Sequence, residues 1–325
     1  MSVTERDPAL VDGAPGGPAQ LLEPREVPLG GPRAMRVQRS LPQRSRSLIG
    51  AWCFVDHYGP DDLSDRGGMR VPGHPHTGLA TVTWLFEGEV EHRDTTGAAV
   101  VVRPGEVNLM TAGRGVAHAE FSLPGTTVVH GAQLWFALPD GAADGGRSLQ
   151  HAVPRVLEHD SAEVRVFVGD WLGSSGAPQA PTPLLGAEVR VPPGRTWRAP
   201  IDPGFEVGLL VDLGEIESAG IRAGRSHLVA LPPGRDEVVL TAGPDGARVL
   251  VLAGTPFPHD VVMWWNFVGR THDEIVAARE DWQGQVEQQR AGAAADGRFG
   301  PHPAEWDEVL PAPVLPTVRL RPRSR

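Results

Sequence analysis

Short apolar runs, each ended by glycine or proline, dominate the sequence from about Pro32 onward. Segment 81–94 has a strand-like run on either side of Gly88, the second returning from the turn, and segment 98–113 is divided in the same way at Pro104. The 40 glycines and 32 prolines of the 325-residue chain provide many such turns. Turns about every ten residues, with no long helical period between them, are typical of antiparallel sandwiches and barrels. The sequence therefore predicts an all-β fold.

The second half of the chain repeats this pattern. The run "VDLGEIES" at 211–218 echoes "LFEGEVEH" at 85–92, and each is followed by a glycine-containing turn and another apolar run. A repeat of this length indicates a duplicated all-β domain. We expect a mobile N-terminal tail over residues 1–30 and two tandem barrels over residues 31–145 and 146–270. A short C-terminal helix with an extended tail is expected over residues 271–325.

A single helix is predicted after the second barrel. Thr271 suits the N-cap position, and Glu274 follows three residues later, as in a capping box. Ile275, Ala278 and Trp282 then recur at helical spacing. The residues that follow are too rich in proline for regular structure, but their apolar side chains indicate that part of this tail packs against a domain.

Charge and composition narrow the range of partners. The net charge of −10 disfavours direct binding to nucleic acid or to an anionic membrane, since both need a basic face. No apolar run is long enough to span a bilayer, and the first twenty residues lack the pattern of a signal peptide. The single cysteine, Cys53, has apolar neighbours and is predicted to be buried, and a chain without disulfides suits the cytoplasm. The chain has no lysine, which excludes Schiff-base chemistry.

Two metal-ligating doublets lie in the first predicted barrel. His74 and His76 flank one proline, and His118 and Glu120 have the same i, i+2 relation. Side chains at i and i+2 of a strand share a face, so each doublet can point into a barrel. Three imidazoles and a carboxylate suit a transition metal, typically non-haem iron, and leave coordination positions open. On spacing alone, a metal site and four unrelated residues on a glycine-rich surface are equal alternatives.

The segments around these residues resemble known motifs. "GMRVPGHPHTG" resembles the first cupin motif and "GRGVAH" the second. "FVDHYGP", "HPHTGLATVTWLFEGEVEHRD", "PGEVNLMTAGRGVAHAE" and "HGAQLWFALP" together resemble the pirin family over residues 34–140, and the likeness continues more weakly over 160–290. The resemblance implies a bicupin, with two jelly-roll barrels of the double-stranded β-helix type. His92 and Arg93 also fit the family, but we interpret them as polar contacts at a strand end.

The resemblance also implies a metal centre in the first barrel. It would hold one Fe²⁺, with Mn, Ni, Cu or Zn as alternatives, and the family's ligands carry over onto His74, His76, His118 and Glu120. The chain departs from the family at Thr77 and Ala80, where relatives typically have arginine and glutamate. Ligation is expected to survive these changes, because pirins take their glutamate ligand from the second motif.

The second barrel is expected to be metal-free. Aligning the two halves sets Pro200 and Asp202 at the positions of the first doublet, and Glu237 and Val239 at those of the second. Neither pair reproduces the H-x-H or H-x-E pattern. Such a barrel would serve as a structural partner or a binding surface.

The resemblance implies more than one class of function. The first is a dioxygenase that opens flavonol-like rings, with O₂ as the second substrate and Glu120 accepting the proton of the 3-hydroxyl group. The second is a regulatory protein that binds a transcription factor or a metabolic enzyme. A cupin enzyme acting on another phenolic or enolisable metabolite is a third alternative. The residues expected to line the pocket for a planar substrate are Phe54, Met110, Arg114 and Trp135.

Overall fold

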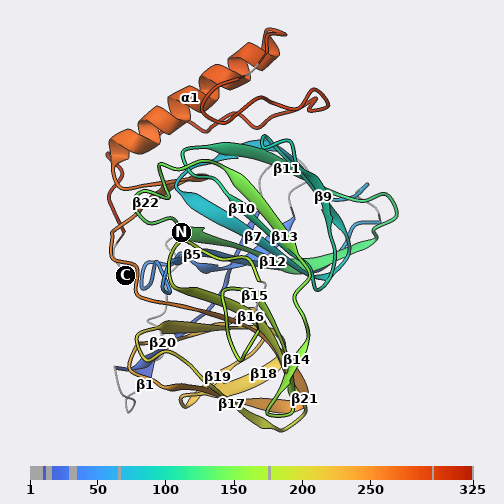
Figure 1. Ribbon diagram of the computed structural model, residues 1–325, viewed down its shortest axis with the longest axis vertical. Helices are drawn as coiled ribbons and strands as arrows, with labels where there is room; N and C mark the ends of the chain where they lie inside the picture. Colours follow the sequence, from blue (N-terminus) through green and yellow to red (C-terminus); the bar gives the residue numbers. More distant parts are fainter. Residues whose placement is uncertain are drawn as a thin grey trace, which may run out of the picture. The chain divides into compact units, whose positions relative to one another are not determined.

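The computed structural model describes residues 10–11, 17–28, 35–64, 67–174, 177–294 and 296–323 (Figure 1). The chain divides into two compact units, each with its own core of buried side chains. The first unit comprises Val27–Val37, Cys53–Val153 and Pro258–Arg325. The second unit comprises Met1–Glu26, Gln38–Trp52 and Pro154–Phe257.

The first unit is built mainly from two sheets. The larger sheet has the order β13-β10-β7-β12-β5-β4-β3. Only part of each of the last two strands belongs to this unit, namely residues 36–37 of β4 and residues 27–28 of β3. The smaller sheet has the order β6-β11-β8-β9. The strands of the larger sheet are β3 (Arg25–Pro28), β4 (Arg36–Leu41), β5 (Trp52–Asp62), β7 (Leu79–Glu87), β10 (Val107–Thr111), β12 (Val128–Ala137) and β13 (Ser148–Ala152). Those of the smaller sheet are β6 (Arg70–His76), β8 (Val90–Asp94), β9 (Ala99–Val102) and β11 (Val116–Ser122).

A glycine turn carries the chain of the first unit from one sheet to the other. β7 and β8 flank Gly88, yet β7 pairs with β10 and β12 in the larger sheet, while β8 pairs with β9 and β11 in the smaller one. Gly88 has a φ of 87°, and a Cβ there would lie 2.3 Å from the carbonyl oxygen of Val128, so only glycine fits. The two strands predicted around Gly88 are confirmed, but the turn crosses between sheets, as in a jelly roll, and does not close a hairpin.

The second unit contains one ten-stranded sheet in which every pairing is antiparallel. Its main path is β1-β2-β20-β18-β21-β16-β15-β14, with β17 paired to β21 and β19 to β18. The described residues form two all-β units and one helix, which confirms the predicted fold class. The strands are β1 (Leu10–Val11), β2 (Ala19–Leu22), β14 (Leu157–His159), β15 (Ala162–Val168), β16 (Leu184–Val191), β17 (Thr196–Pro200), β18 (Glu206–Ser218), β19 (Ile221–Ala223), β20 (Leu228–Leu231) and β21 (Glu237–Gly254).

Part of the predicted N-terminal tail belongs to this sheet. β2 pairs with β20, and Ala19 and Leu22 are buried by the pairing. Besides the short strands at 10–11 and 25–28, the predicted tail over 1–30 thus contains the strand at 19–22, while residues 1–9, 12–16 and 29–30 lie outside the described part of the chain. Four residues are too few to reveal a period, and their strand structure depends on a partner from a distant part of the sequence.

The predicted helix is present as α1 (His272–Arg290). The backbone N–H of Glu274 donates to Thr271 Oγ1 at 3.2 Å, which confirms the expected N-cap. Ile275, Ala278 and Trp282 are buried, as their spacing predicts. Figure 1 shows the C-terminal tail running back beside α1, and tail residues that include Trp306 and Val309 share a core cluster with the helix.

The described part of the chain contains no helix that combines the length and the apolar character needed to cross a membrane.

C-terminal segments cover the free edge of β6. In the smaller sheet β6 is an edge strand with β11 on one side. On its other side, the N–H of Gly73 donates to the carbonyl of Glu308 at 3.3 Å, and the N–H of Leu310 donates to the carbonyl of Gly73 at 2.8 Å. The N–H of Val268, in β23 (Phe267–Gly269), donates to the carbonyl of Thr77 at 3.0 Å. These bonds occupy backbone groups that an open edge would expose, and they hold the strand that carries the first histidine doublet.

Replacing Trp282 tests how much the helix stabilises the first unit. Trp282 is fully buried, and its Nε1 donates to the carbonyl of Leu310 at 2.8 Å. We expect Trp282→Ala to lower the free energy of unfolding by about 3–5 kcal/mol in denaturant titrations, because it leaves a cavity under the tail. Val318→Ala, at a side chain 69% exposed, is the control and should change stability by less than about 0.5 kcal/mol. If the two variants lowered the free energy of unfolding equally, the helix would not stabilise the first unit as proposed.

Candidate metal centre

Three histidine side chains meet where β6 pairs with β11. The antiparallel register sets His74 directly opposite His118, and His76 lies two residues further along β6. The ring centroids of His74 and His118 are 4.3 Å apart, and those of the other two pairs are each 5.0 Å apart. All three side chains are buried, and one ring nitrogen from each lies within 4.8 Å of the others. The structure thus brings together three of the four predicted metal ligands in what we call the histidine cluster.

The ring nitrogens of the histidine cluster face one another. His76 Nε2 and His118 Nε2 are 3.0 Å apart. His74 Nδ1 lies 2.9 Å from the carbonyl of Pro72, which can only accept, so Nδ1 donates and Nε2 keeps the lone pair. Two imidazole nitrogens bound at right angles to one metal at about 2.1 Å would be about 3.0 Å apart. The spacing therefore fits a shared metal ion.

Burial keeps these imidazoles neutral. The loss of hydration lowers the pKa of His74 to about 4. Burial, together with the neighbouring histidines, lowers the pKa values of His76 and His118 well below the usual range. Because a metal binds the lone pair of neutral imidazole, all three side chains are in the ligating form near neutral pH.

The fourth predicted ligand, Glu120, lies near His118 and His92 and is not one of the three residues of the histidine cluster. The pairing of β11 with β6 shifts between His118 and Glu120, so that Glu120 is opposite Val71. A Glu120 carboxylate oxygen lies within 4.8 Å of ring nitrogens of His92 and His118, in a second group that shares His118 with the histidine cluster. Thr83 Oγ1 lies 3.4 Å from Glu120 Oε1 and 3.0 Å from Gln133 Oε1, so its one proton has two acceptors within reach. Burial raises the pKa of Glu120. The irregular register displaces Glu120 along β6, which simple i, i+2 alternation does not anticipate.

An aromatic pair extends from the histidine cluster. The ring of Trp135 meets that of His76 edge-on, with centroids 5.1 Å apart. Phe54 stacks on Trp135 at 3.9 Å, with an interplanar angle of 10°. Met110 is fully buried in a core cluster with Val116, and it pairs with Thr81, the residue that Trp135 faces from the other side. Arg114 has an exposed side chain in the turn after β10. The structure therefore places Trp135 beside His76, with Phe54 stacked on it.

The two positions that depart from the family pattern are packed positions next to the histidine cluster. Thr77 and Ala80 are both buried. Thr77 holds β23 through its carbonyl, and Ala80 lies in β7 between Thr111 of β10 and Phe136 of β12. Thr77 directly follows the ligand candidate His76, and neither Thr77 nor Ala80 belongs to the groups of candidate metal ligands.

His92 connects the histidine cluster to a buried carboxylate. Its Nδ1 lies 3.2 Å from His118 Nδ1, and its Nε2 lies 3.0 Å from Asp94 Oδ2. Although burial opposes ionisation, the hydrogen bonds from His92 and Thr96 hold the pKa of Asp94 below its ordinary value. The sequence interpretation of His92 as a strand-end polar contact misses its contact with a predicted ligand. The i, i+2 spacing that puts His92 and Asp94 on the same strand face as the apolar Val90 is the sequence signal that could have revealed it, and the structure buries all three.

The equivalent position in the second unit has different chemistry. β17 pairs with β21 so that Pro200 is opposite Glu237, which is the pairing that the alignment of the two halves predicts for the positions of His74 and His118. Glu237 forms an exposed ion pair with Arg198 at 2.8 Å. This position therefore offers a single carboxylate that already has a cationic partner.

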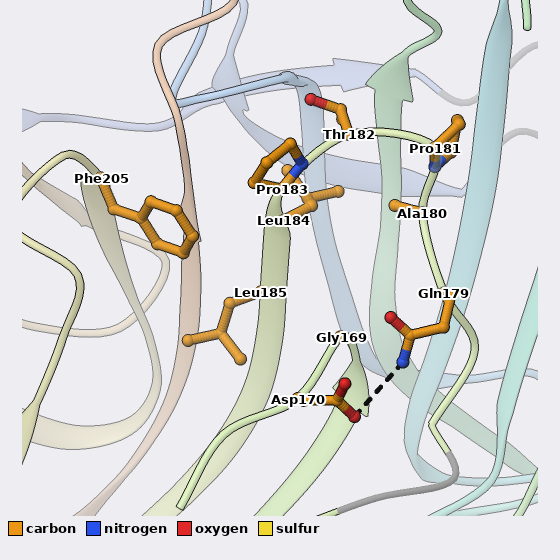
Figure 2. Close-up of a pocket in the computed structure, with 10 residues that line it drawn as sticks. All are labelled: Gly169, Asp170, Gln179, Ala180, Pro181, Thr182, Pro183, Leu184, Leu185 and Phe205. Carbon is orange, nitrogen blue, oxygen red and sulfur yellow. Dashed lines mark hydrogen bonds between the residues drawn. The ribbon is translucent and has the colours of Figure 1, made fainter.

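The second unit also has an open pocket of about 520 Å³ (Figure 2). Figure 2 shows Phe205 at the left of the view, Gln179, Ala180 and Pro181 at the right, and Leu185 between them, with Asp170 below. Gln179 Nε2 donates to Asp170 Oδ1 at 3.3 Å. Among the residues that line this pocket, Asp170 is the one carboxylate and there is no histidine, so the pocket does not provide a set of metal ligands.

Comparisons with known families place these features in context. The Pirin family model matches residues 34–136, and the model of the pirin C-terminal cupin domain matches residues 186–286. A Pseudomonas aeruginosa protein named "Putative quercetin 2,3-dioxygenase" is 40% identical over 299 residues, which cover 91% of this chain and 90% of that protein. A "Pirin-like protein" of Caulobacter vibrioides is 31% identical over 257 residues, which cover 76% of this chain and 88% of that protein.

Solved structures agree with this likeness. A crystal structure of quercetin 2,3-dioxygenase from Acinetobacter baumannii is 36% identical to this chain, with a TM-score of 0.83. The alignment covers 94% of this chain and 97% of that one. The similarity therefore extends over both units.

Acid should destabilise the metal-free protein through the histidine cluster. A histidine whose pKa in the folded protein is depressed binds its proton more readily in the unfolded chain, where the pKa is near 6.5. We therefore expect the contribution of His74 to stability to be fully present above about pH 6.5 and to be lost as the pH falls toward about 4, at up to about 1.4 kcal/mol per pH unit. Urea unfolding of the metal-free protein at several pH values measures this loss.

The raised pKa of Glu120 has the opposite effect on stability, because a carboxyl that is more basic in the folded protein stabilises it as the pH falls. A His74 variant separates the loss of stability caused by the histidine from this gain. His74→Gln should show a shallower fall in stability between about pH 6.5 and 4 than the unmodified protein. His227→Gln, at a histidine of the second unit, should keep the full slope. An unchanged slope in His74→Gln would contradict the depressed pKa.

Proposed function

Because this chain belongs to the pirin family, we propose that it is a metal-dependent dioxygenase that opens flavonol-like substrates. The observation that carries the proposal is the buried cluster of three neutral imidazoles whose nitrogens converge at metal-ligand spacing. Two relatives with similarity over nine-tenths of this chain are named for quercetin 2,3-dioxygenase activity, which supports the choice of substrate class.

We propose one Fe²⁺ per chain, with Mn, Ni, Cu and Zn as the alternatives. Its ligands would be the histidine cluster and Glu120, a set of nitrogen and oxygen donors suited to these metals. When bound, the metal would act as a Lewis acid with open coordination positions. We further propose that the metal-binding cupin spans residues 31–145 and that the cupin over 146–270 is metal-free, since Pro200 and Glu237 occupy its equivalent position.

Glu120 is the residue we assign to proton transfer. Burial raises its pKa, which makes its carboxylate a better proton acceptor than an exposed one. A flavonol must lose the proton of its 3-hydroxyl group to become an electron-rich enolate that can react with O₂. Glu120 would accept this proton, and the hydroxyl of Thr83 lies within reach of its carboxylate at 3.4 Å.

Trp135 and Phe54 are the residues we assign to substrate orientation. Their stacked rings form an apolar wall that begins beside His76. A planar polyphenol laid against this wall would be held with its hydroxyl groups toward the histidine cluster, and water would be kept from the reacting ring.

The environment of Cys53 fits a cytoplasmic protein. Cys53 is fully buried, and burial raises its pKa to about 12, so the thiol is structural and unreactive. A chain whose only cysteine is buried has no need of an oxidising compartment, and we place the protein in the cytoplasm.

Removing His118 should abolish metal binding. We expect His118→Ala to lose most of the iron found by elemental analysis of the unmodified protein, because one ligand is lost and the others become misaligned. His227→Ala is the matched control, because His227 lies in the second unit with its Nδ1 3.1 Å from the carbonyl of Arg225, and it should keep its metal. Undiminished iron in His118→Ala would refute the site.

The iron-loaded protein should consume quercetin in air, with loss of flavonol absorbance and release of carbon monoxide. We expect Trp135→Leu to raise KM for quercetin about tenfold while metal content stays unchanged, because a stacking contact of about 1.4 kcal/mol is lost. Steady-state kinetics with elemental analysis of both proteins measures this. If iron-replete protein leaves quercetin intact and instead retains one partner protein in stoichiometric amount, the enzymatic function is wrong and the regulatory alternative is favoured.

A further inference from the structure

We propose that Asp94 and His92 form a positioning relay that fixes the ring of His118 with its Nε2 lone pair turned toward the histidine cluster. The inference rests on the proposed metal site, and it concerns residues outside the predicted ligand set. The relay consists of three buried side chains joined in series, from Asp94 through His92 to His118.

The hydrogen bonds around Asp94 determine its role as an acceptor. Its Oδ1 accepts from the backbone N–H of Thr96 at 2.7 Å and from Thr96 Oγ1 at 2.5 Å, and the N–H of Ala98 is 3.4 Å away. Its Oδ2 is the atom that faces His92 Nε2 at 3.0 Å. An ionised carboxylate has no proton to give, so His92 Nε2 must donate.

The proton positions along the rest of the relay follow from this bond. In neutral His92 the proton is on Nε2, so Nδ1 carries a lone pair. His118 Nδ1 faces that lone pair at 3.2 Å and must donate to it. His118 Nε2 is then free of a proton, and this is the atom that lies 3.0 Å from His76 Nε2 in the histidine cluster. The carboxylate thus selects the ligating tautomer of His118 through one intervening ring.

Backbone contacts hold the relay against β11. Thr95, which follows Asp94 directly, donates its N–H to the carbonyl of Ala117 at 2.9 Å. The N–H of Ala117 donates in return to Thr95 Oγ1 at 3.0 Å, and that hydroxyl donates to the carbonyl of Phe299 at 2.5 Å. The turn after β8 is therefore bound to the residue that precedes His118, which limits movement of the relay relative to the ring it orients.

The sharpest test reverses one hydrogen bond without changing volume. In Asp94→Asn the single amide oxygen would be retained by the two Thr96 donors, so the amide NH₂ would face His92 Nε2 and force it to accept. The His92 proton would move to Nδ1, where it opposes the proton on His118 Nδ1. We expect Asp94→Asn and His92→Ala each to weaken metal binding about 10- to 100-fold.

The measurement is the dissociation constant for Co²⁺ in competition with a chelator, together with the visible absorption spectrum of the Co²⁺ protein. The spectrum responds to ligand orientation, which a general loss of stability would not alter. Urea unfolding of the metal-free variants should show that both still fold. Glu91→Gln is the matched control, because Glu91 lies on the same strand but pairs with Arg93 in a half-exposed contact, and it should leave the constant and the spectrum unchanged. His92→Asn, which keeps one donor and one acceptor, should recover part of the affinity.

The outcomes separate the relay from the metal site. If the unmodified protein binds Co²⁺, His118→Ala does not, and Asp94→Asn binds as tightly as the unmodified protein, the relay is refuted while the metal site stands. If His118→Ala also binds normally, the metal site itself is wrong. Binding of two Co²⁺ per chain would make His92 a direct ligand and would overturn the relay. A loss of Co²⁺ affinity in His92→Ala that Asp94→Asn does not share would lead to the same conclusion. Such a result would favour a second group formed by His92, His118 and Glu120.

Discussion

The candidate site depends on the pairing of β6 with β11. The register that sets His74 opposite His118 brings imidazoles from distant parts of the sequence face to face. A slip of one residue would turn a doublet to the other face of the sheet, because side chains alternate along a strand. The pairing is supported on both sides, by β8 next to β11 and by the C-terminal segments that bond to β6. The geometry of the ligands is therefore set by sheet register more than by any loop.

Features with a local pattern could be predicted from the sequence. The helix and its N-cap follow from the spacing of Thr271, Glu274 and three apolar residues, and the strands on either side of Gly88 follow from a short apolar run and a turn. The doublets were visible as ligand candidates, but spacing alone could not separate a metal site from an accidental grouping. The resemblance to a family resolved that choice, because it supplies the information about three-dimensional proximity that spacing lacks.

Features that depend on distant partners could not be predicted in the same way. The strand at 19–22 exists because β20 offers an edge, and the turn at Gly88 crosses between sheets because β7 and β8 find different neighbours. Glu120 is displaced by an irregularity in the register with β6, and His92 contacts His118 across a strand pair. Each of these depends on which strands become neighbours, and a period of two within one strand carries no information about its partner.

The first unit is formed by three segments that are separated in the sequence, so it cannot be completed until the last segment has been synthesised. The strand β6 is made early, but the residues that cover its edge, at 308–310, follow the whole of the second unit in the sequence. Until they emerge from the ribosome, β6 presents a row of unpaired backbone groups, which is the kind of edge to which another chain can add a strand. The strand that carries His74 and His76 is therefore completed last, and the nascent chain has to be kept from pairing with its neighbours at that strand.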